Sequence, residues 1–424
     1  MKKLCVVSCP IATRSGYGSR SRDLVRSLIE LKGDVWDIKI MPQRWGNTPQ
    51  NVLTSEDSDL TSRFIGQLQQ KPDVWIQITI PSEFQPVGNF NIGVSAVIET
   101  TEASPDFIEG CNRMDLTLVS SEHSKTTLQA IYDKLDEKTK QKVDEVKLNK
   151  PVEVLFEGFD EKIYDNKKPI HQSVNEVMDN VKEDFAFLFV GHWLQGNLGH
   201  DRKNVSGMIH TFFNTFKNKM KQPALILKTS ITAPGITNVH ELRKRVEMIK
   251  GMIDSKNLPN VYILDGDLSD DEMNSLYNHP KVKAHVSFTR GEGYGRPLLE
   301  ACVSGKPIIA SNWSGHLDFL NKDYNFLVGG ELQNVDKSAA NKWLLEQSKW
   351  FTINYGEAGG VIKWIYDNYK KGLEKSRKNR KYVKDNFTLD KMSSKLSEIL
   401  DTYKVGEGPQ QVELKLPKLK KIDA

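Results

Sequence analysis

Short apolar runs alternate with longer stretches of helical spacing along most of the chain, in two successive sets. The first set comprises residues 4–8, 35–40, 74–78, 92–98, 116–119 and 152–156. The second set comprises residues 185–190, 224–228, 261–264, 284–288, 307–310 and 326–328. Alternation of strands with helices predicts parallel sheets covered by helices. We therefore expect an α/β protein with two such sheets.

Polar stretches mark the expected domain limits. Residues 160–184 are largely polar and separate the two sets, so we expect domains at 1–170 and 171–385. Apolar side chains at helical spacing between about 386 and 403 predict a docking helix. Residues 404–424 contain two prolines and several lysines and predict a basic tail of low order. Residues 133–150, rich in Lys, Asp and Glu, predict a solvated helix or loop.

Composition narrows the class of protein. A length of 424 residues suits two domains, and a net charge of +4 is too small to imply nucleic-acid binding by itself. No apolar run is long enough to span a membrane. The apolar part of the first residues is too short for a signal peptide and is interpreted as a strand. Four cysteines without C-x-x-C spacing predict buried, reduced thiols and a cytoplasmic protein.

The most informative motif lies between the apolar runs 284–288 and 307–310. A glycine-rich turn there precedes Pro297, and Glu292 and Glu300 flank this segment. Glycine allows close backbone approach, and proline suits the first turn of a helix. Free N–H groups at a helix start hold phosphate, and open α/β sheets bind ligands at the carboxyl ends of their strands. The motif therefore predicts a phosphate-binding loop with two carboxylates.

At this motif the chain resembles the retaining glycosyltransferases of family 4, which have the GT-B fold. Further stretches match that family in order and spacing: 15–18, 119–125, 154–160, 189–191 with 201–204, and 314–318. The resemblance extends to about residue 403. It implies two Rossmann-like, doubly wound domains facing across a cleft, with the C-terminal helix packed back on the N-terminal domain. It also implies transfer of a sugar from a nucleotide-diphosphate sugar to an acceptor hydroxyl, with retention at the anomeric carbon.

The resemblance assigns catalytic roles to three residues. Lys203 would stabilise the negative charge on the leaving diphosphate. Glu292 would face the donor sugar. Glu99 occupies the place where many members carry a histidine, and it would bind the acceptor hydroxyl or stabilise an oxocarbenium-like state. A turn acid at the end of a strand is the plain alternative for Glu99.

One departure from the family pattern concerns the second cation. The family has an arginine directly after the position of Gly191, where this chain has His192. The candidate replacements are Arg202, Lys228, Arg290 and Arg296. The insertion 193–200 lengthens the same loop and would cover the donor or the acceptor.

Donor binding is assigned by the same resemblance. Glu300 would accept hydrogen bonds from the ribose hydroxyls, although a helix-start charge that complements the dipole is its alternative role. Gly16 and Gly18 would let the N-terminal backbone approach the diphosphate. Backbone N–H groups for phosphate or sugar would come from Gly293, Tyr294, Gly295 and Arg296. We expect no cofactor; the nucleotide sugar, preferably a UDP-sugar, is a substrate.

A possible metal motif has a simpler interpretation. Asp265 and Asp267 have the D-x-D spacing that chelates divalent cations. They follow a predicted strand and precede residues 269–272, which have the pattern of a capping box. No histidine pair has zinc-site spacing. We therefore predict a strand–helix turn and no metal.

Two alternatives remain at this stage. The acceptor would be a hydroxymethylated base in DNA, as for some bacteriophage enzymes, if basic residues contacted a phosphate backbone. The residues concerned are Arg14, Arg20, Arg22, Arg26 and the lysines of the tail. They suit a surface helix equally well. The second alternative is a non-catalytic nucleotide-sugar-binding protein of GT-B type, against which the presence of Glu292, Glu300 and Lys203 argues.

Overall fold

The computed structural model describes residues 2–46, 48–135, 139, 141–231 and 234–407. Its first sheet has six parallel strands in the order β2-β1-β3-β4-β5-β8. These strands are β1 (Lys3–Cys9), β2 (Trp36–Pro42), β3 (Val74–Ile78), β4 (Phe90–Ser95), β5 (Leu116–Val119) and β8 (Val152–Val154). This order places β1 inside the sheet, between β2 and β3. Because the strands are parallel, the loop after β1 lies at the same edge as the loops after its neighbours.

The second sheet repeats this architecture, with six parallel strands in the order β11-β10-β9-β12-β13-β14. These strands are β9 (Ala186–Val190), β10 (Ala224–Lys228), β11 (Val261–Leu264), β12 (Val282–Ser287), β13 (Ile308–Ser311) and β14 (Phe326–Val328). Every predicted apolar run forms a strand, and the predicted α/β class with two parallel sheets is confirmed.

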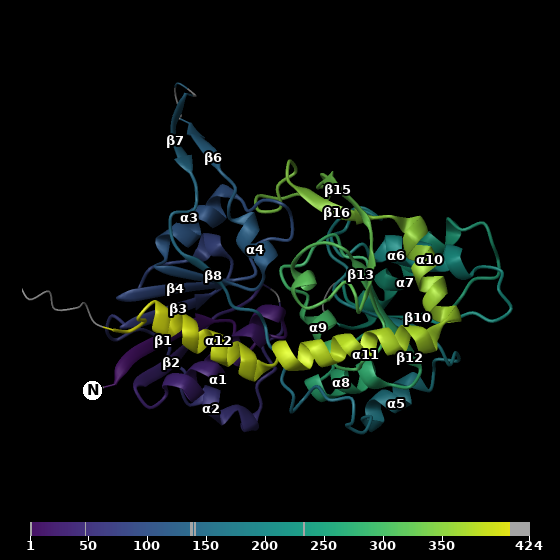
Figure 1. Ribbon diagram of the computed structural model, residues 1–424, viewed down its shortest axis with the longest axis horizontal. Coiled ribbons are helices and arrows are strands. Elements are labelled where there is room, and N and C mark those ends of the chain that lie inside the picture. The colour runs from purple at the N-terminus through teal and green to yellow at the C-terminus, as the bar shows by residue number, and fades with distance from the viewer. Residues whose placement is uncertain (1, 47, 136–138, 140, 232–233, 408–424) are drawn as a thin grey trace, which may run out of the picture.

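Helices lie on both sides of the two sheets (Figure 1). Those of the first half are α1 (Gly16–Lys32), α2 (Ser58–Thr61), α3 (Pro105–Arg113), α4 (Glu122–Thr127) and α5 (Gln172–Met178). Those of the second half are α6 (Val205–Phe216), α7 (Ile236–Gly251), α8 (Asp270–Asn278), α9 (Arg296–Cys302), α10 (Tyr355–Asp367), α11 (Tyr369–Asn386) and α12 (Leu389–Thr402). Short 3-10 turns cover Ser55–Asp57, Pro81–Glu83 and Gly315–Asp318.

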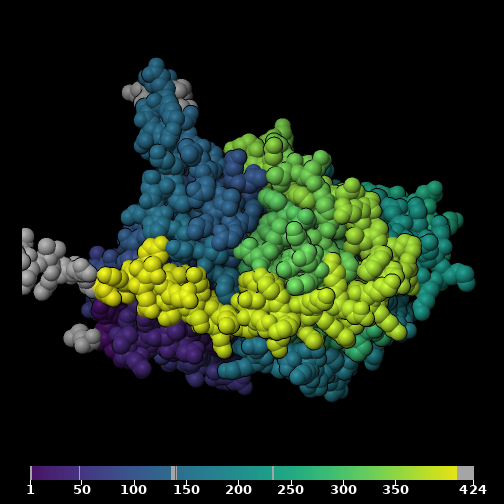
Figure 2. All heavy atoms as spheres, viewed as in Figure 1, coloured from purple at the N-terminus to yellow at the C-terminus, as the bar shows by residue number. Residues whose placement is uncertain are grey.

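The last helices carry the chain back from the second sheet to the first (Figures 1 and 2). Met392, Leu396 and Leu400 of α12 are buried in the same apolar core as the strands of the first sheet. The Ser393 hydroxyl also lies 2.7 Å from the Ser27 hydroxyl of α1. The C-terminal helix α12 therefore belongs to the core of the first, N-terminal sheet.

Three features differ from the sequence prediction. Residues 133–150, predicted as a solvated helix or loop, contribute instead to an antiparallel hairpin of β6 (Tyr132–Leu135) and β7 (Lys142–Val146), which projects from the molecule (Figure 2). Its polar, exposed strands lack the apolar alternation that predicts strands. A second hairpin, β15 (Gly330–Asn334) with β16 (Lys349–Ile353), was not predicted. The strand predicted at 92–98 ends at Ser95, because Val97 takes a left-handed φ of 58°.

The remaining predictions concern the cysteines, membrane-spanning helices, the C-terminal tail and the domain limits. All four cysteines are buried, as predicted. In the part of the chain that the structure describes, no helix is long and apolar enough to cross a membrane. Residues 408–424 of the predicted tail lie outside the described residues. The predicted domain limits stay a prediction.

Candidate active site

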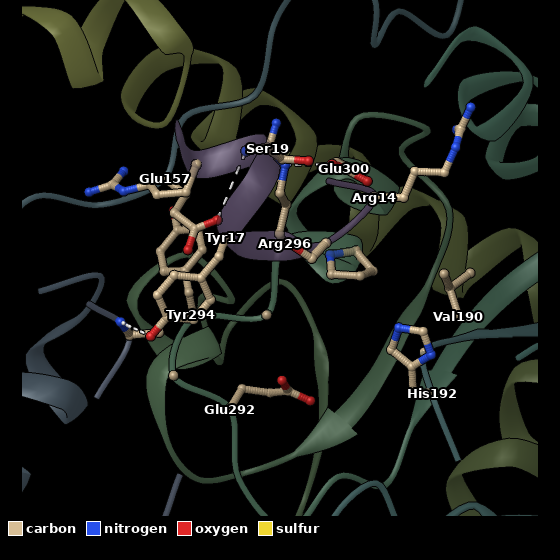
Figure 3. Close-up of a pocket in the computed structure, with 18 of the residues that line it drawn as sticks. Arg14, Tyr17, Ser19, Glu157, Val190, His192, Glu292, Tyr294, Arg296 and Glu300 are labelled. Atoms are coloured by element: carbon tan, nitrogen blue, oxygen red, sulfur yellow. Dashed lines mark hydrogen bonds and ion pairs between the residues drawn. The ribbon is translucent and has the colours of Figure 1, made fainter. Parts of the chain in front are cut away.

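A cavity of about 560 Å³ lies between loops at the carboxyl ends of both sheets (Figure 3). From the predicted site residues, its lining contains Gly16, Glu99, Arg202, Lys203, Lys228, Glu292, Gly293, Tyr294, Gly295, Arg296 and Glu300. Residues far apart in sequence therefore converge on one volume. The lining, as far as the structure describes it, includes neither Gly18 nor Arg290.

The two residues outside the lining have structural partners of their own. A Cβ on Gly18 would stand 2.1 Å from the carbonyl oxygen of Thr13, so this glycine allows a tight turn before α1. Arg290 donates to the Thr352 hydroxyl and, at 2.7 Å, to the Gly199 carbonyl, and it lies over the ring of Trp350. Arg290 is therefore removed from the candidates for the missing cation, because its guanidinium connects loops away from the cavity.

The glycine loop, residues 289–295, packs against the backbone of the first sheet's loop after β4. A Cβ on Gly291 would stand 1.9 Å from the Glu99 carbonyl oxygen, and one on Gly293 would stand 2.7 Å from that of Ala96. Gly295 adopts a φ of 98° immediately before α9. The sequence predicted that these glycines admit a ligand; the structure shows that two of them also admit the opposite backbone.

Serine hydroxyls strengthen this contact. The Ser121 hydroxyl, which also caps α4, donates to the Gly293 carbonyl at 2.5 Å. Nearby, the Glu122 N–H donates to the Asp318 carboxylate at 3.0 Å. Thr101 and Lys349 exchange two further hydrogen bonds between the same halves of the chain. The two sheets are thus held in direct contact beside the cavity.

Four charged side chains form a network on one wall. The Lys203 ammonium lies 2.5 Å from Glu292, while Arg202 lies 3.4 Å from Glu292 and 3.1 Å from Glu99. Glu292 is 7% exposed. Burial alone would raise the pKa of Glu292, but the charges of Lys203 and Arg202 outweigh it and lower the pKa to about 2. The predicted catalytic residues therefore meet in one ionic network.

A second network surrounds Glu300 at the start of α9. Arg296 donates to Glu300 at 2.9 Å and pairs with Asp23 of α1 at 2.5 Å, and the Tyr277 hydroxyl donates to Glu300 at 3.3 Å (Figure 3 shows Arg296 and Glu300). Burial raises the pKa of Glu300 to about 7, against the lowering effect of Arg296. Arg296 therefore bonds a carboxylate from each half of the chain and is no free cation.

His192 stands where the resemblance expects an arginine. Its Nδ1 lies 2.8 Å from the Ser230 hydroxyl, and its side chain lines the cavity (Figure 3). Burial lowers the pKa of His192, and the charges of Lys203 and Lys228 lower it further. The imidazole is therefore neutral at neutral pH and brings no positive charge to this position.

The sequence analysis assigned no role to two aromatic residues of the lining. Tyr17 stacks on Trp45 with ring centroids 4.0 Å apart, and its hydroxyl accepts from the Ala96 N–H at 3.1 Å. Both rings line the cavity on the side of the first sheet. Tyr17 lies inside the matched stretch 15–18 and was detectable there, whereas the loop of Trp45 has no recognised pattern. Asp23, the partner of Arg296, has no local signal either.

The arginines proposed for DNA contact do not form an exposed surface. Arg20 is 4% exposed and Arg22 is 9% exposed, and both donate to backbone carbonyls. Arg26 pairs with Asp57 and a second aspartate. The guanidiniums of Arg20 and Arg22 are already satisfied, so the interpretation of this helix as a phosphate-binding face is wrong for these two residues, whereas the side chain of Arg26 is 40% exposed. Arg14 lies at the cavity, 3.6 Å from an aspartate.

The D-x-D sequence forms a turn before α8. Asp265 accepts from the Gly235 N–H at 2.8 Å and from the Asn238 side chain at 2.6 Å. Ser269 and Glu272 form the predicted capping box at the start of the helix. The carboxylate of Asp265 thus has structural partners. That the protein needs no metal stays a prediction.

Comparisons with known proteins agree with this architecture. Residues 239–349 match the model of the family described as glycosyl transferases group 1. The sequence matches no curated protein. The structure is similar to that of Anabaena Alr3699/HepE in complex with UDP and glucose, with a TM-score of 0.59, 12% identity, and coverage of 94% of this chain and 100% of that one.

Two further solved structures are similar over nearly their whole length. Sucrose-phosphate synthase (tll1590) from Thermosynechococcus elongatus has a TM-score of 0.61 and 11% identity, covering 96% of this chain and 100% of that one. A glycosyltransferase from Rickettsia africae ESF-5 has a TM-score of 0.61 and 14% identity, covering 95% and 98%. The chain therefore has the GT-B fold, with its two α/β sheets on either side of the cavity.

Proposed function

We propose that this protein is a retaining glycosyltransferase that moves a sugar from a nucleotide-diphosphate sugar to an acceptor hydroxyl. The observation that carries the proposal is the network of Lys203, Arg202 and Glu292 in the cavity between the two sheets. The match of residues 239–349 to the group 1 glycosyl transferases supports the same chemistry. A UDP-sugar is the favoured donor, since the similar Anabaena structure holds UDP and glucose.

The reaction breaks the bond between the anomeric carbon and the diphosphate and forms a bond to the acceptor oxygen on the same face. The electron pair of the broken bond leaves with the diphosphate. The acceptor proton passes to the departing phosphate oxygen, which lies on that face. Lys203 and Arg202 would stabilise the developing charge, because preorganised cations in a water-poor site act most strongly where charge appears.

The carboxylates would take the remaining roles. Glu300 would bind the ribose hydroxyls, in reach of its partners Arg296 and Tyr277. Glu292 would orient Lys203 and face the sugar. Glu99, which pairs with Arg202, would bind the acceptor hydroxyl or stabilise positive charge on the sugar ring. Contact between the halves of the chain would exclude water from the donor.

The alternatives have less support. A binding protein without catalysis would also place Lys203 and Arg202 against the donor diphosphate, so turnover of the donor is what separates it from the proposed enzyme. Modified DNA as the acceptor loses its main support, since Arg20, Arg22 and Arg26 have partners within the protein. Neither alternative is favoured by a specific contact.

A thermal-shift screen tests the proposed function. The protein is heated with UDP-, GDP- and ADP-sugars, each at several concentrations. A ligand at a hundred times its Kd stabilises the folded state by about 2.7 kcal/mol. We expect one nucleotide class to raise the melting temperature in a concentration-dependent way, and Glu300→Ala to reduce that rise. A screen in which no nucleotide sugar raises the melting temperature would contradict the proposal.

A further inference from the structure

The site described so far has an unfilled requirement for positive charge at the end of β9. His192 stands there as a neutral imidazole held by the Ser230 hydroxyl. Arg290 lies outside the cavity lining, and Arg296 is bound to Asp23 and Glu300. A leaving diphosphate gains negative charge. Without a further cation, only Lys203 and Arg202 would stabilise that charge.

Lys228 lies on the neighbouring strand at the same edge of the sheet. In the parallel pair of β9 and β10, Lys228 is in register with Val190, and its carbonyl accepts from the Gly191 N–H at 3.1 Å. Lys228 and His192 therefore leave adjacent strands side by side. Both side chains line the same cavity.

The ammonium of Lys228 is the most available charge in that lining. Within the described residues it forms no ion pair and donates to one acceptor, the Gly266 carbonyl, at 2.6 Å. An ammonium has three donors, so two remain for a ligand. By contrast, the other basic side chains of the lining are committed: Lys203, Arg202, Arg296 and Arg14 to carboxylates, and Arg20 and Arg22 to backbone carbonyls.

The two acids whose charges act on Lys228 have other partners. Asp267 pairs with Arg14, and Asp265 accepts from the Gly235 N–H and from Asn238. Burial lowers the pKa of Lys228, and the charges of Asp267 and Asp265 act in the opposite direction. A bound anion would act in the same direction as these acids and favour the charged ammonium.

We infer that Lys228 is a further cation of this site, beside Lys203 and Arg202, and contacts the diphosphate of the donor in place of the arginine that His192 replaces. The assignment rests on the proposed function and adds a catalytic residue to it. A cation at the end of β10 instead of the end of β9 lies at the same edge of the second sheet.

The competing explanation for Lys228 is structural. Its bond to Gly266, which has a φ of 99°, would hold the turn before α8 without touching a ligand. This turn contributes Asp267 and Leu268 to the cavity and leads into α8, which contributes Met273, so its loss would disturb all parts of a bound nucleotide. A diphosphate contact would affect only ligands that carry a diphosphate.

Affinities for UDP and uridine, measured by titration calorimetry, separate the two explanations. We expect Lys228→Met to weaken UDP binding about tenfold or more, the loss of one charge-assisted contact, while the Kd for uridine changes less than about twofold. Lys228→Arg, which keeps a cation, should lose less. Adding His192→Arg to Lys228→Met should restore UDP affinity. Lys250→Met, on an exposed lysine of α7 that pairs with Glu247, is the matched control and should match the wild type.

Each other outcome has a defined meaning. Unchanged UDP affinity in Lys228→Met overturns the assignment. Equal losses for UDP and uridine overturn it in favour of the structural role. A wild-type protein that binds no nucleoside diphosphate overturns both the assignment of Lys228 and the proposed function. If the wild type binds UDP, a failure of the Lys228 assignment leaves the proposed function standing.

Discussion

Gly291 lies so close to Glu99 that a Cβ on the glycine would stand 1.9 Å from the Glu99 carbonyl oxygen. The glycine belongs to the loop after β12, and the glutamate to the loop after β4. Their contact brings the two sheets to the separation at which Arg202 reaches the Glu99 carboxylate. The missing side chain at Gly291, together with that at Gly293, thus allows the close approach of the two halves beside the cavity.

Gly291→Ala should keep the protein folded and remove most of its activity. The methyl group forces the loops apart, and a misplacement of about 1 Å can cost about a hundredfold in rate. We expect a fall of that size in kcat/KM for the nucleotide sugar, with nucleotide binding less affected. Gly360→Ala is the control, because no atom lies within 4 Å of a Cβ there. Wild-type turnover by Gly291→Ala would show that this contact is not needed.

Ser121→Ala tests the same closure from the other side. The change removes the 2.5 Å hydrogen bond to the Gly293 carbonyl and the hydroxyl cap of α4. We expect kcat/KM to fall about tenfold, the value of a hydrogen bond worth about 1.4 kcal/mol. Thr126→Ala, which removes an exposed hydroxyl bonded within α4, should have little effect. Equal kinetics of the two variants would argue against a role for Ser121 in positioning the loop.

Glu300 should make ligand binding depend on pH near neutrality. Its pKa is about 7, so the carboxyl is mostly protonated at pH 6 and mostly ionised at pH 8. The ionised form accepts both ribose hydroxyls, so affinity for uridine should rise with pH, by up to about tenfold over this range. Glu300→Gln cannot ionise and should bind weakly at both pH values. A flat profile for the wild type, measured by calorimetry, would contradict this role of Glu300.

Asp23→Ala should lower stability much more than an exposed acid does. The change leaves the buried guanidinium of Arg296 without one of its carboxylates. Breaking a buried ion pair costs about 3–5 kcal/mol, and an exposed pair about 0–1 kcal/mol. We expect a clear fall in melting temperature for Asp23→Ala and almost none for Asp401→Ala, whose carboxylate pairs with Lys32 at the surface. Similar shifts for both variants would mean that Arg296 does not depend on Asp23.

The sequence was sufficient for the fold where neighbouring residues carry the signal. Buried strands such as β9 and β10 appear as nearly continuous apolar runs, because helices cover both faces of a parallel sheet. The hairpin of β6 and β7 is mostly exposed, with only Tyr132 and Val146 of its described residues packed against the core, and it therefore has no such run. The end of β4 was misplaced because the left-handed conformation of Val97 has no sequence signature in a valine.

The site divides in the same way. The glycine loop and Lys203 were recognisable because each belongs to a short contiguous motif. The pairing of Arg296 with Asp23 connects residues far apart in the chain, and no local pattern predicts it. Arg20 and Arg22 were taken for surface charge, whereas backbone carbonyls at the ends of other segments make their burial possible. The residue types were visible in the sequence, but the distant residues with which they pair were not.

The central claim is that this cavity cleaves a nucleotide sugar with Lys203 stabilising the departing diphosphate. Its most direct test is the rate of nucleoside diphosphate release from UDP-, GDP- and ADP-sugars, with water as a slow acceptor, for the wild type, Lys203→Met and Lys250→Met. We predict release from one donor class by the wild type and Lys250→Met, and a loss of about 10²–10³-fold in Lys203→Met. No release from any donor, or equal rates for the wild type and Lys203→Met, would contradict the claim.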